Sequence, residues 1–251
     1  MYEILNISYA TVTELFEMFD AKLDGIVDQL TFLKHFQRPW VLKQILANLS
    51  SVKTSTILSI GEGYDIAAGI LSNKYKAKVY VLDKYEKDEV LDESRYDWGI
   101  TVEDLKKKNP EVTYVYGLAG MPALHLLGDN MFDCIYSNSV LEHIPHENFG
   151  DAIDDMDRML KRNGIQVHAI DFPIDLYLEL LQFYKEKIGQ FVLRDHRSKL
   201  DEIDTVKIRA NPMTFYEPVD SFKRWWFPMR ERKDVKYERW TSLNIVLKKI
   251  S

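Results

Sequence analysis

The sequence predicts an α/β fold with an open, mostly parallel sheet, because a buried strand, a glycine turn, a helix and a second strand follow one another within residues 55–83. Thr56–Ile60 is a short apolar run bounded by turn residues, which is typical of a strand covered on both faces. Gly61 and Gly63 permit the tight turn that follows. Lys78–Leu82 predicts the second strand. Strands and helices then alternate over most of the chain.

Asp83 stands at the carboxyl end of the second strand, the edge at which open α/β sheets bind ligands. The two glycines let backbone amides approach a ligand there, and the next helix directs its positive N-terminal end to the same place. An acid about twenty residues after the glycines suits the hydroxyl groups of a ribose. The segment therefore predicts a nucleoside site, with a tight turn of purely structural function as the alternative.

Two common nucleotide motifs are excluded. The dinucleotide fingerprint needs a third glycine three residues after Gly63, where Ile66 stands instead. A P-loop needs Gly-Lys-Ser/Thr, which does not follow. The glycine turn therefore belongs neither to a dinucleotide-binding fingerprint nor to a P-loop.

Three further strands and a closing hairpin complete the predicted sheet. Val112–Tyr116 predicts the third strand, and residues 131–144 (MFDCIYSNSVLEHI) predict a fourth strand that continues into a helix. The fifth strand ends in VHAID. Thr241–Lys249 predicts a final strand, which would pair antiparallel with a strand around Phe227–Lys233.

The chain is divided into an N-terminal segment and a main domain that contains an insert. Residues 1–50 are interpreted as a helical segment, because apolar residues recur there at helical spacing. Residues 51–251 are the main domain. Within it, residues 190–220 combine mixed charge with weak periodicity, which indicates an inserted loop or lid.

The composition excludes several classes of protein. The 251 residues carry a net charge of −6, which argues against a surface for nucleic acid. The single cysteine, Cys134, can build neither a disulfide framework nor a zinc site, as is usual in a reducing cytoplasm. No signal peptide or long apolar run occurs. We therefore expect a cytoplasmic protein with no membrane span.

Five features in order resemble the class I S-adenosylmethionine (SAM)-dependent methyltransferases. These are the glycine turn, the acid after the second strand, the short third strand, the FD-strand-VLEH segment and RMLKRNG before the fifth strand. Ser59, Gly61, Gly63 and Asp65 occupy the four positions of the family's acid-x-Gly-x-Gly-x-Gly motif, so its acid and last glycine are replaced. The resemblance implies a Rossmann-like seven-stranded sheet in the order 3-2-1-4-5-7-6, with the last strand antiparallel and helices on both faces.

The resemblance also implies that SAM is the cofactor and indicates which residues bind it. Asp83 would accept hydrogen bonds from the ribose, and the glycine turn would face the methionine part. Leu118 stands where the family often holds the adenine with an acid, so apolar packing would hold it here. The predicted cofactor-binding residues are Gly61, Glu62, Gly63, Asp83, Lys84, Leu118, Ala119, Ser137 and Asn138.

A hydroxyl acceptor requires a base, and candidates stand at the ends of the fourth and fifth strands. Methyl transfer is an in-line displacement that depends mainly on alignment, and a positioned base adds about 10²- to 10⁴-fold. The predicted catalytic residues are His143, Asp171 and His168. For both histidines, a structural role is an equally good interpretation.

No metal is expected. Some quinone-modifying relatives bind magnesium through an acid-x-x-Glu-His set, and Ser139 stands where the first carboxylate of that set would be. Glu142 and His143 remain able to contribute to a site.

The resemblance implies that an N-terminal segment packs over the cofactor cleft and that this segment and an insert before the sixth strand bind the substrate. In this chain these are residues 1–50 and 190–220, and both contain arginine and aromatic side chains. Arginine binds phosphate in a bidentate manner, and aromatic faces suit sugar rings. The order FQRPW, LEHI, VHAIDF resembles bacterial methyltransferases of surface and capsular polysaccharide clusters, which modify hydroxyls of sugars that are often nucleotide-linked. The residues assigned to this role are Arg38, Trp40, Arg194, His196, Arg197 and Tyr216. Packing in the core, or plain solvation, is the alternative for such side chains.

Three functions remain open at this point. The chain is expected to be an O-methyltransferase that acts on a sugar, or a methyltransferase that acts on a quinone, a lipid or a natural product, or a non-catalytic SAM-binding module. A nucleic-acid methylase is disfavoured, because SNSV replaces its Asn/Asp-Pro-Pro-aromatic motif. The expected partner is a small-molecule acceptor, and a homodimer is considered.

Overall fold

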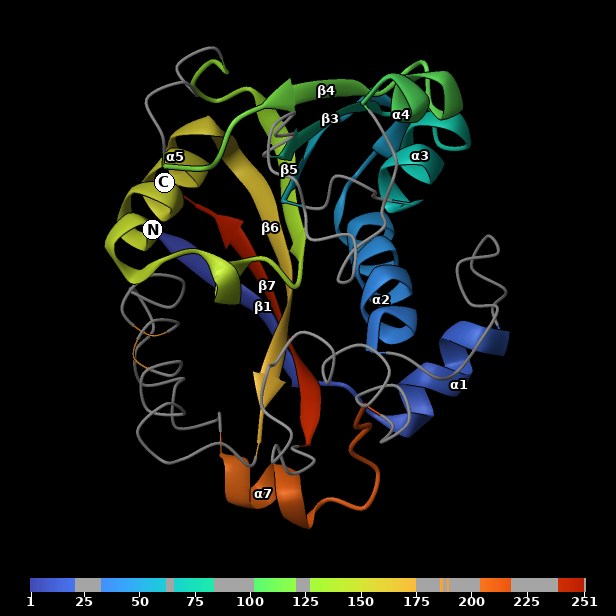
Figure 1. Ribbon diagram of the computed structural model, residues 1–251, viewed down its shortest axis with the longest axis vertical. Helices are drawn as coiled ribbons and strands as arrows, with labels where there is room; N and C mark the ends of the chain where they lie inside the picture. Colours follow the sequence, from blue (N-terminus) through green and yellow to red (C-terminus); the bar gives the residue numbers. More distant parts are fainter. Residues whose placement is uncertain are drawn as a thin grey trace, which may run out of the picture.

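Seven strands form one mixed sheet at the centre of the computed structural model (Figure 1). The strand order is β1-β7-β6-β5-β2-β3-β4. The strands are β1 (Tyr2–Tyr9), β2 (Thr56–Ile60), β3 (Lys78–Asp83), β4 (Thr113–Tyr116), β5 (Phe132–Asn138), β6 (Leu160–Pro173) and β7 (Trp240–Lys249). The residues that the structure describes are 1–20, 33–61, 66–83, 102–120, 127–174, 186, 189, 204–217 and 239–250.

The five strands β4, β3, β2, β5 and β6 run parallel, and β7 is antiparallel to β6. This is the Rossmann-like class I methyltransferase sheet that the sequence predicts. Parallel neighbours need crossover connections, which helices supply on both faces of the sheet. The elements between and around the strands are α1 (Val12–Asp20), α2 (Leu33–Asn48), η1 (Val52–Thr54), α3 (Ile66–Asn73), α4 (Val102–Lys108), η3 (Leu141–His143), α5 (His146–Met159) and α7 (Thr205–Ala210).

The edge strand beside β7 comes from the N-terminus, which corrects the interpretation of residues 1–50 as helical. Tyr2–Tyr9 pairs antiparallel with β7, and only later residues of this segment form α1 and α2. A register shift between Ile4 and Asn6 breaks the alternation of inward and outward side chains, so the period of two that marks a strand is hidden. The strand expected around Phe227–Lys233 lies outside the described residues.

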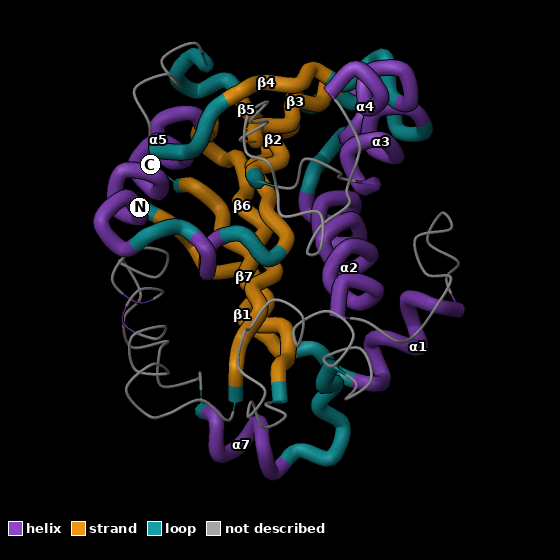
Figure 2. Tube along the Cα trace, viewed as in Figure 1, coloured by secondary structure: helices purple, strands orange, loops and turns teal. Residues whose placement is uncertain are grey.

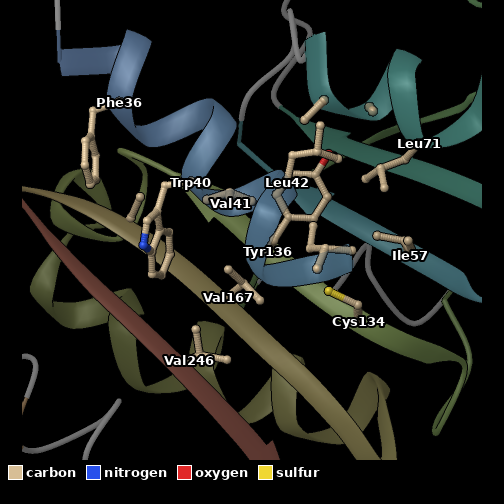
Figure 3. Packing of buried hydrophobic residues seen from close by; sticks show 14 of the residues in the cluster. Phe36, Trp40, Val41, Leu42, Ile57, Leu71, Cys134, Tyr136, Val167 and Val246 are labelled. Carbon is tan, nitrogen blue, oxygen red and sulfur yellow. The ribbon is translucent and has the colours of Figure 1, made fainter. Parts of the chain in front are cut away.

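The helices cover the sheet in two layers (Figure 2). Helices α1, α2 and α3 pack on one face and α5 packs on the other, each against its own apolar cluster. Trp40 of α2 lies over the sheet near Val167, in the apolar layer that also holds Phe36, Val246 and Cys134 (Figure 3). Cys134 is fully buried, so it is the small core residue that the sequence indicated. This packing holds α2 tightly over the strands.

None of the described helices combines the length and the apolar character that crossing a membrane requires.

Candidate functional site

Parallel strands end together at one edge of the sheet, and the predicted cofactor residues follow them. Ile60 of β2 lies opposite Leu82 of β3 on one side and Ser137 of β5 on the other. The residues that come next, Gly61 and Asp83, therefore lie side by side at this edge. The crevice outside such carboxyl ends is where open α/β sheets bind ligands.

Gly61 satisfies two requirements that only a glycine can meet here. Its φ is +73°, in the left-handed region that favours glycine. A Cβ atom built on it would lie 2.4 Å from Cγ1 of Val140, which follows β5. The Gly61 amide donates a hydrogen bond of 2.7 Å to the carbonyl of Leu82. The missing side chain of Gly61 thus leaves room for Val140, and the turn packs against the end of β3 and the residues after β5.

Asp83 ends β3 as a half-buried residue, in the place expected for a ribose-binding acid. Its carbonyl accepts a hydrogen bond of 3.0 Å from the amide of Gly117, which connects the ends of β3 and β4. Leu118 is half-buried and Ala119 is 7 % exposed directly after this contact, which agrees with an apolar wall for the adenine. Three predicted cofactor residues lie outside the described residues: Glu62, Gly63 and Lys84.

Ser137 directs its side chain away from the edge and into a buried chain of hydrogen bonds. Its hydroxyl lies 2.8 Å from Nδ1 of His168, whose Nε2 lies 2.9 Å from Oε1 of Gln166. Gln166 in turn donates to the hydroxyl of Tyr2 over 2.7 Å, and Tyr2 donates to Asp157 over 2.8 Å. The chain crosses the sheet from the site to β1, so only the backbone of Ser137 remains for the cofactor.

His168 has the structural role that the sequence left open. It is completely buried, and both of its ring nitrogens have protein partners. The carbonyl of Gln166 can only accept, so Nε2 carries the proton and Nδ1 accepts from Ser137. Burial lowers the pKa of His168 to about 3, which keeps the ring neutral. The predicted catalytic role of His168 therefore finds no support in its position.

Asp171 is held at the site edge by residues from three elements. It is 6 % exposed, and its Oδ1 accepts hydrogen bonds from Nε2 of Gln37 over 2.7 Å and from the hydroxyl of Ser139 over 2.5 Å. Its backbone amide donates to Oε1 of Glu142 over 2.8 Å. The hydrogen bond from the Gln37 amide connects the end of β6 to α2, and the hydrogen bond from the Asp171 backbone to Glu142 connects it to η3.

The surroundings of Glu142 favour its protonated form. Burial, and after it the negative charge of Asp171, raises the pKa of Glu142 to about 8. The charge of Lys34 and backbone hydrogen bonds oppose this increase. At neutral pH, Glu142 therefore holds its proton and supports the backbone of β6.

His143 completes a cluster with these two acids. It is exposed, and one ligand atom from each of Glu142, His143 and Asp171 lies within 4.8 Å of the others. Such a group can exchange protons with solvent or can hold a metal ion. In the sequence, Ser139 replaces the first carboxylate of the family's magnesium-binding set. In the structure, β6 brings the carboxyl group of Asp171 beside η3, where it could take the place of that carboxylate as a metal ligand. The expectation of no metal stays a prediction.

The predicted substrate residues divide into different environments. Arg38 is half-buried on α2, whereas Trp40 is 1 % exposed and packs in the core (Figure 3), so the assignment of Trp40 to substrate is wrong. Tyr216 is half-buried, donates to the carbonyl of Ile208 over 3.2 Å and lies below the guanidinium of Arg239. The other three lie outside the described residues: Arg194, His196 and Arg197.

Gln37, Ser139 and Lys34 contact the site without having been predicted. Lys34 Nζ lies 3.5 Å from the carbonyl of Asn138, itself a predicted cofactor residue that is 2 % exposed. Gln37 is the residue before the predicted Arg38, but α2 rotates it by about 100° towards the sheet. No pattern in the sequence marks which residue of this helix faces the site.

One protein family and several solved structures are similar to this chain. The family model described as a methyltransferase domain matches residues 58–167. A search of curated protein sequences finds no match to the chain. Among solved structures, the YcgJ protein from Bacillus subtilis is similar at 15% identity, with a TM-score of 0.48, over 84% of this chain and 99% of that one. A TehB-like SAM-dependent methyltransferase from Corynebacterium glutamicum is similar at 17% identity, with a TM-score of 0.44, over 70% and 82%.

The matched segment begins in β2 and ends in β6, so it contains the glycine turn, Asp83 and the end of β5. Together, the sheet order, the site edge and this match define a class I SAM-dependent methyltransferase domain. The protein is a SAM-dependent methyltransferase, and SAM is its cofactor.

We expect the substitution Gly61→Ala to weaken SAM binding at least tenfold and to lower the free energy of unfolding by about 1–3 kcal/mol, since the Cβ collides with Val140 and the φ is strained. The double variant Gly61→Ala/Val140→Ala should recover part of both losses, because it removes the collision and keeps the strain. Calorimetry with SAM and chemical denaturation measure the two effects. Equal losses in the single and double variants would contradict the packing argument.

The substitution Asp83→Ala should reduce the affinity for SAM by about tenfold or more, because hydrogen bonds from a ligand to a charged group contribute about 1.5–3 kcal/mol. Glu111, which is exposed before β4, provides a matched control as Glu111→Ala. Undiminished SAM binding by the Asp83 variant would show that another group holds the ribose.

His168 predicts a loss of stability in acid. Its pKa is lower in the folded than in the unfolded protein, so its contribution is complete above pH 6.5 and falls as the unfolded chain takes up a proton below that pH. Between pH 7 and pH 4.5 the loss amounts to roughly 2–3 kcal/mol. The variant His168→Asn should show a shallower decline of unfolding free energy with pH, whereas His146→Asn, at an exposed position, should match the wild type. Identical pH slopes in all three proteins would refute a buried neutral ring.

Proposed function

We propose that this methyltransferase transfers the methyl group to a hydroxyl of a small molecule, and that the acceptor is a sugar carried on a nucleotide diphosphate. Bound SAM supplies an electrophilic methyl group on a positively charged sulfur. The chain has to align the acceptor oxygen with that group and to accept the proton which the hydroxyl loses. Asp171 is assigned to accept this proton, and His143 is assigned to pass it on to solvent.

The observation that supports a hydroxyl acceptor is that the protein holds Asp171 through only one of its two carboxylate oxygens. Its Oδ1 receives two hydrogen bonds from the protein, and among the described residues no hydrogen bond reaches its Oδ2. A carboxylate that is held in this way presents one oxygen to a ligand in a constant direction. Two neighbouring acids in different environments are a common arrangement for acid–base chemistry, and Glu142 is the neighbour whose pKa burial raises. A neutral hydroxyl needs such a base, because it is a weak nucleophile while it keeps its proton.

The sugar acceptor is supported by sequence features. The order FQRPW, LEHI, VHAIDF is similar to that of methyltransferases of surface polysaccharide clusters. Residues 190–220 contain three arginines, and Arg38 stands in the N-terminal segment. Such side chains suit a diphosphate and a sugar ring. A cytoplasmic location would agree with a nucleotide-linked acceptor and with the lack of any cysteine pair. Quinones, lipids and natural products with a hydroxyl group are the second candidates.

The substitution Asp171→Asn should lower kcat by about 10²- to 10⁴-fold and should leave the Kd for SAM within about threefold of the wild type, because the amide keeps the shape and cannot accept the proton. Asp151→Asn, at an exposed position on α5, is the matched control for loss of a carboxylate. Full activity of the Asp171 variant would remove it as the base.

The acceptor is tested by incubating the protein with SAM and a panel of UDP-, GDP- and dTDP-sugars, followed by mass spectrometry for a product 14 Da heavier and by detection of S-adenosylhomocysteine. Turnover of one of these sugars supports the proposal. Turnover of quinones, lipid headgroups or phenolic natural products alone selects the second class. Binding of SAM without turnover of any acceptor selects a non-catalytic module. Each assay is run with EDTA and with Mg²⁺, because activity that requires the ion would assign the cluster of Glu142, His143 and Asp171 to metal binding.

A further inference from the structure

Gln37 is a polar residue placed where a hydrophobic one would be expected. Its side chain is 0 % exposed, and its neighbours on α2, Phe36 and Trp40, belong to the apolar core. A buried amide costs free energy unless its donors and acceptor are satisfied. Among the residues that the structure describes, the hydrogen-bond partners of Gln37 are side chains at the site, so its presence on this helix has to be explained by the site.

The hydrogen bonds of Gln37 determine how its amide is oriented. Nε2 donates to Oδ1 of Asp171 over 2.7 Å and to the hydroxyl of Ser242 over 3.3 Å, and Oε1 lies 2.8 Å from the hydroxyl of Ser139. A carboxylate accepts only, so the nitrogen of the amide must face Asp171. The opposite orientation would place two acceptors together. Each polar atom of Gln37 therefore has one possible assignment.

The packing of α2 keeps this amide in place. Phe36 is fully buried and stacks on Phe215 at 6.2 Å between ring centroids. Asp171 of β6 is the register partner of Ser242 of β7, so Gln37 spans two paired residues of neighbouring strands. A single side chain thus connects helix α2, β6 and β7 at the edge where the site lies.

We propose that Gln37 is a positioning residue for methyl transfer, which together with Ser139 holds Oδ1 of Asp171 so that Oδ2 faces the methyl acceptor. This inference rests on the proposed role of Asp171 and extends it to a residue on the N-terminal segment. Ser139 has one hydroxyl hydrogen, and it lies within hydrogen-bond distance of both Asp171 Oδ1 and Gln37 Oε1. Its hydroxyl can therefore turn from Asp171 to Gln37 when Asp171 takes up a proton. The network accommodates both protonation states of Asp171 without moving α2.

The first test removes the hydrogen bonds of Gln37 and keeps its volume. Gln37→Leu should lower kcat by about 10- to 100-fold, with the Kd for SAM changed by less than about threefold, because displaced catalytic groups lose rate rather than cofactor affinity. The assay uses the nucleotide-sugar, or the other hydroxyl compound, that the wild type methylates in the panel above. Gln44→Leu is the matched control, since Gln44 lies two turns further along α2 and its Oε1 accepts from Asn48.

The second test changes the charge next to Asp171. Gln37→Glu places a second carboxyl group beside Oδ1, and two such groups hold a proton more tightly than one. The other titratable groups that surround Asp171 are Glu142 and His143 of η3, and Lys34 of α2 acts on Glu142. The acid limb of the pH–kcat/KM profile should move up by about one pH unit or more, while Gln44→Glu leaves it in place.

A carbon-13 titration of the aspartate carboxyl groups, with the Asp171 signal identified by its loss in Asp171→Asn, gives a readout that requires no acceptor. The midpoint for Asp171 should rise in Gln37→Glu and stay constant in Gln44→Glu. If Gln37 is only structural, Gln37→Leu lowers Tm while kcat per folded molecule and the pH profile stay those of the wild type, and the inference is overturned. If Asp171→Asn is fully active, the proposed function fails instead, whatever the Gln37 variants do.

Discussion

The parallel pairing of β2 with β3 and β5 is the constraint on which the rest of this protein depends. Since all three strands run in the same direction, their carboxyl ends meet at one edge, and the chain must leave that edge through three turns in a small space. The turn after β2 therefore requires a glycine at position 61, because Val140, which follows β5, occupies the volume that a Cβ would need.

The second consequence is a buried polar layer between α2 and the ends of β5, β6 and β7. Gln37, Ser139, Asp171 and Ser242 are all at least nine-tenths buried and are joined by hydrogen bonds. An apolar layer would stabilise the fold at least as well, since polar burial yields little net stability even when it is fully satisfied. The polar layer contributes by fixing orientation, because it holds the carboxylate of Asp171 in one direction at the edge of the sheet. Stability and chemistry thus make different demands on the same helix.

Secondary structure and sheet order were predictable where the sequence carries a local signal. The apolar run of β2, the glycine turn and the acid after β3 follow from periodicity and from backbone sterics, and they lie where they were expected. Strand β1 was missed because its register shift hides the alternation of Tyr2, Ile4, Ile7 and Tyr9. Trp40 was assigned to substrate for its residue type, but its place on α2 turns it into the core. In both cases the decisive information is a contact with a distant part of the chain.

The sequence by itself determined the class of protein and its cofactor. A glycine turn, an acid and the FD-strand-VLEH segment are local patterns with a fixed order, and a parallel sheet permits few ways to arrange them. Only the tertiary structure decided which polar residues act together. His168 and Asp171 are three residues apart on one strand, yet one points into a buried hydrogen-bond chain and the other reaches the site edge. Gln37 and Asp171 are separated by 134 residues, and no local pattern specifies that a helix and a strand so distant in the chain come within 2.7 Å. The physical reason is that such a contact depends on the packing of α2 against the sheet, which involves the entire core.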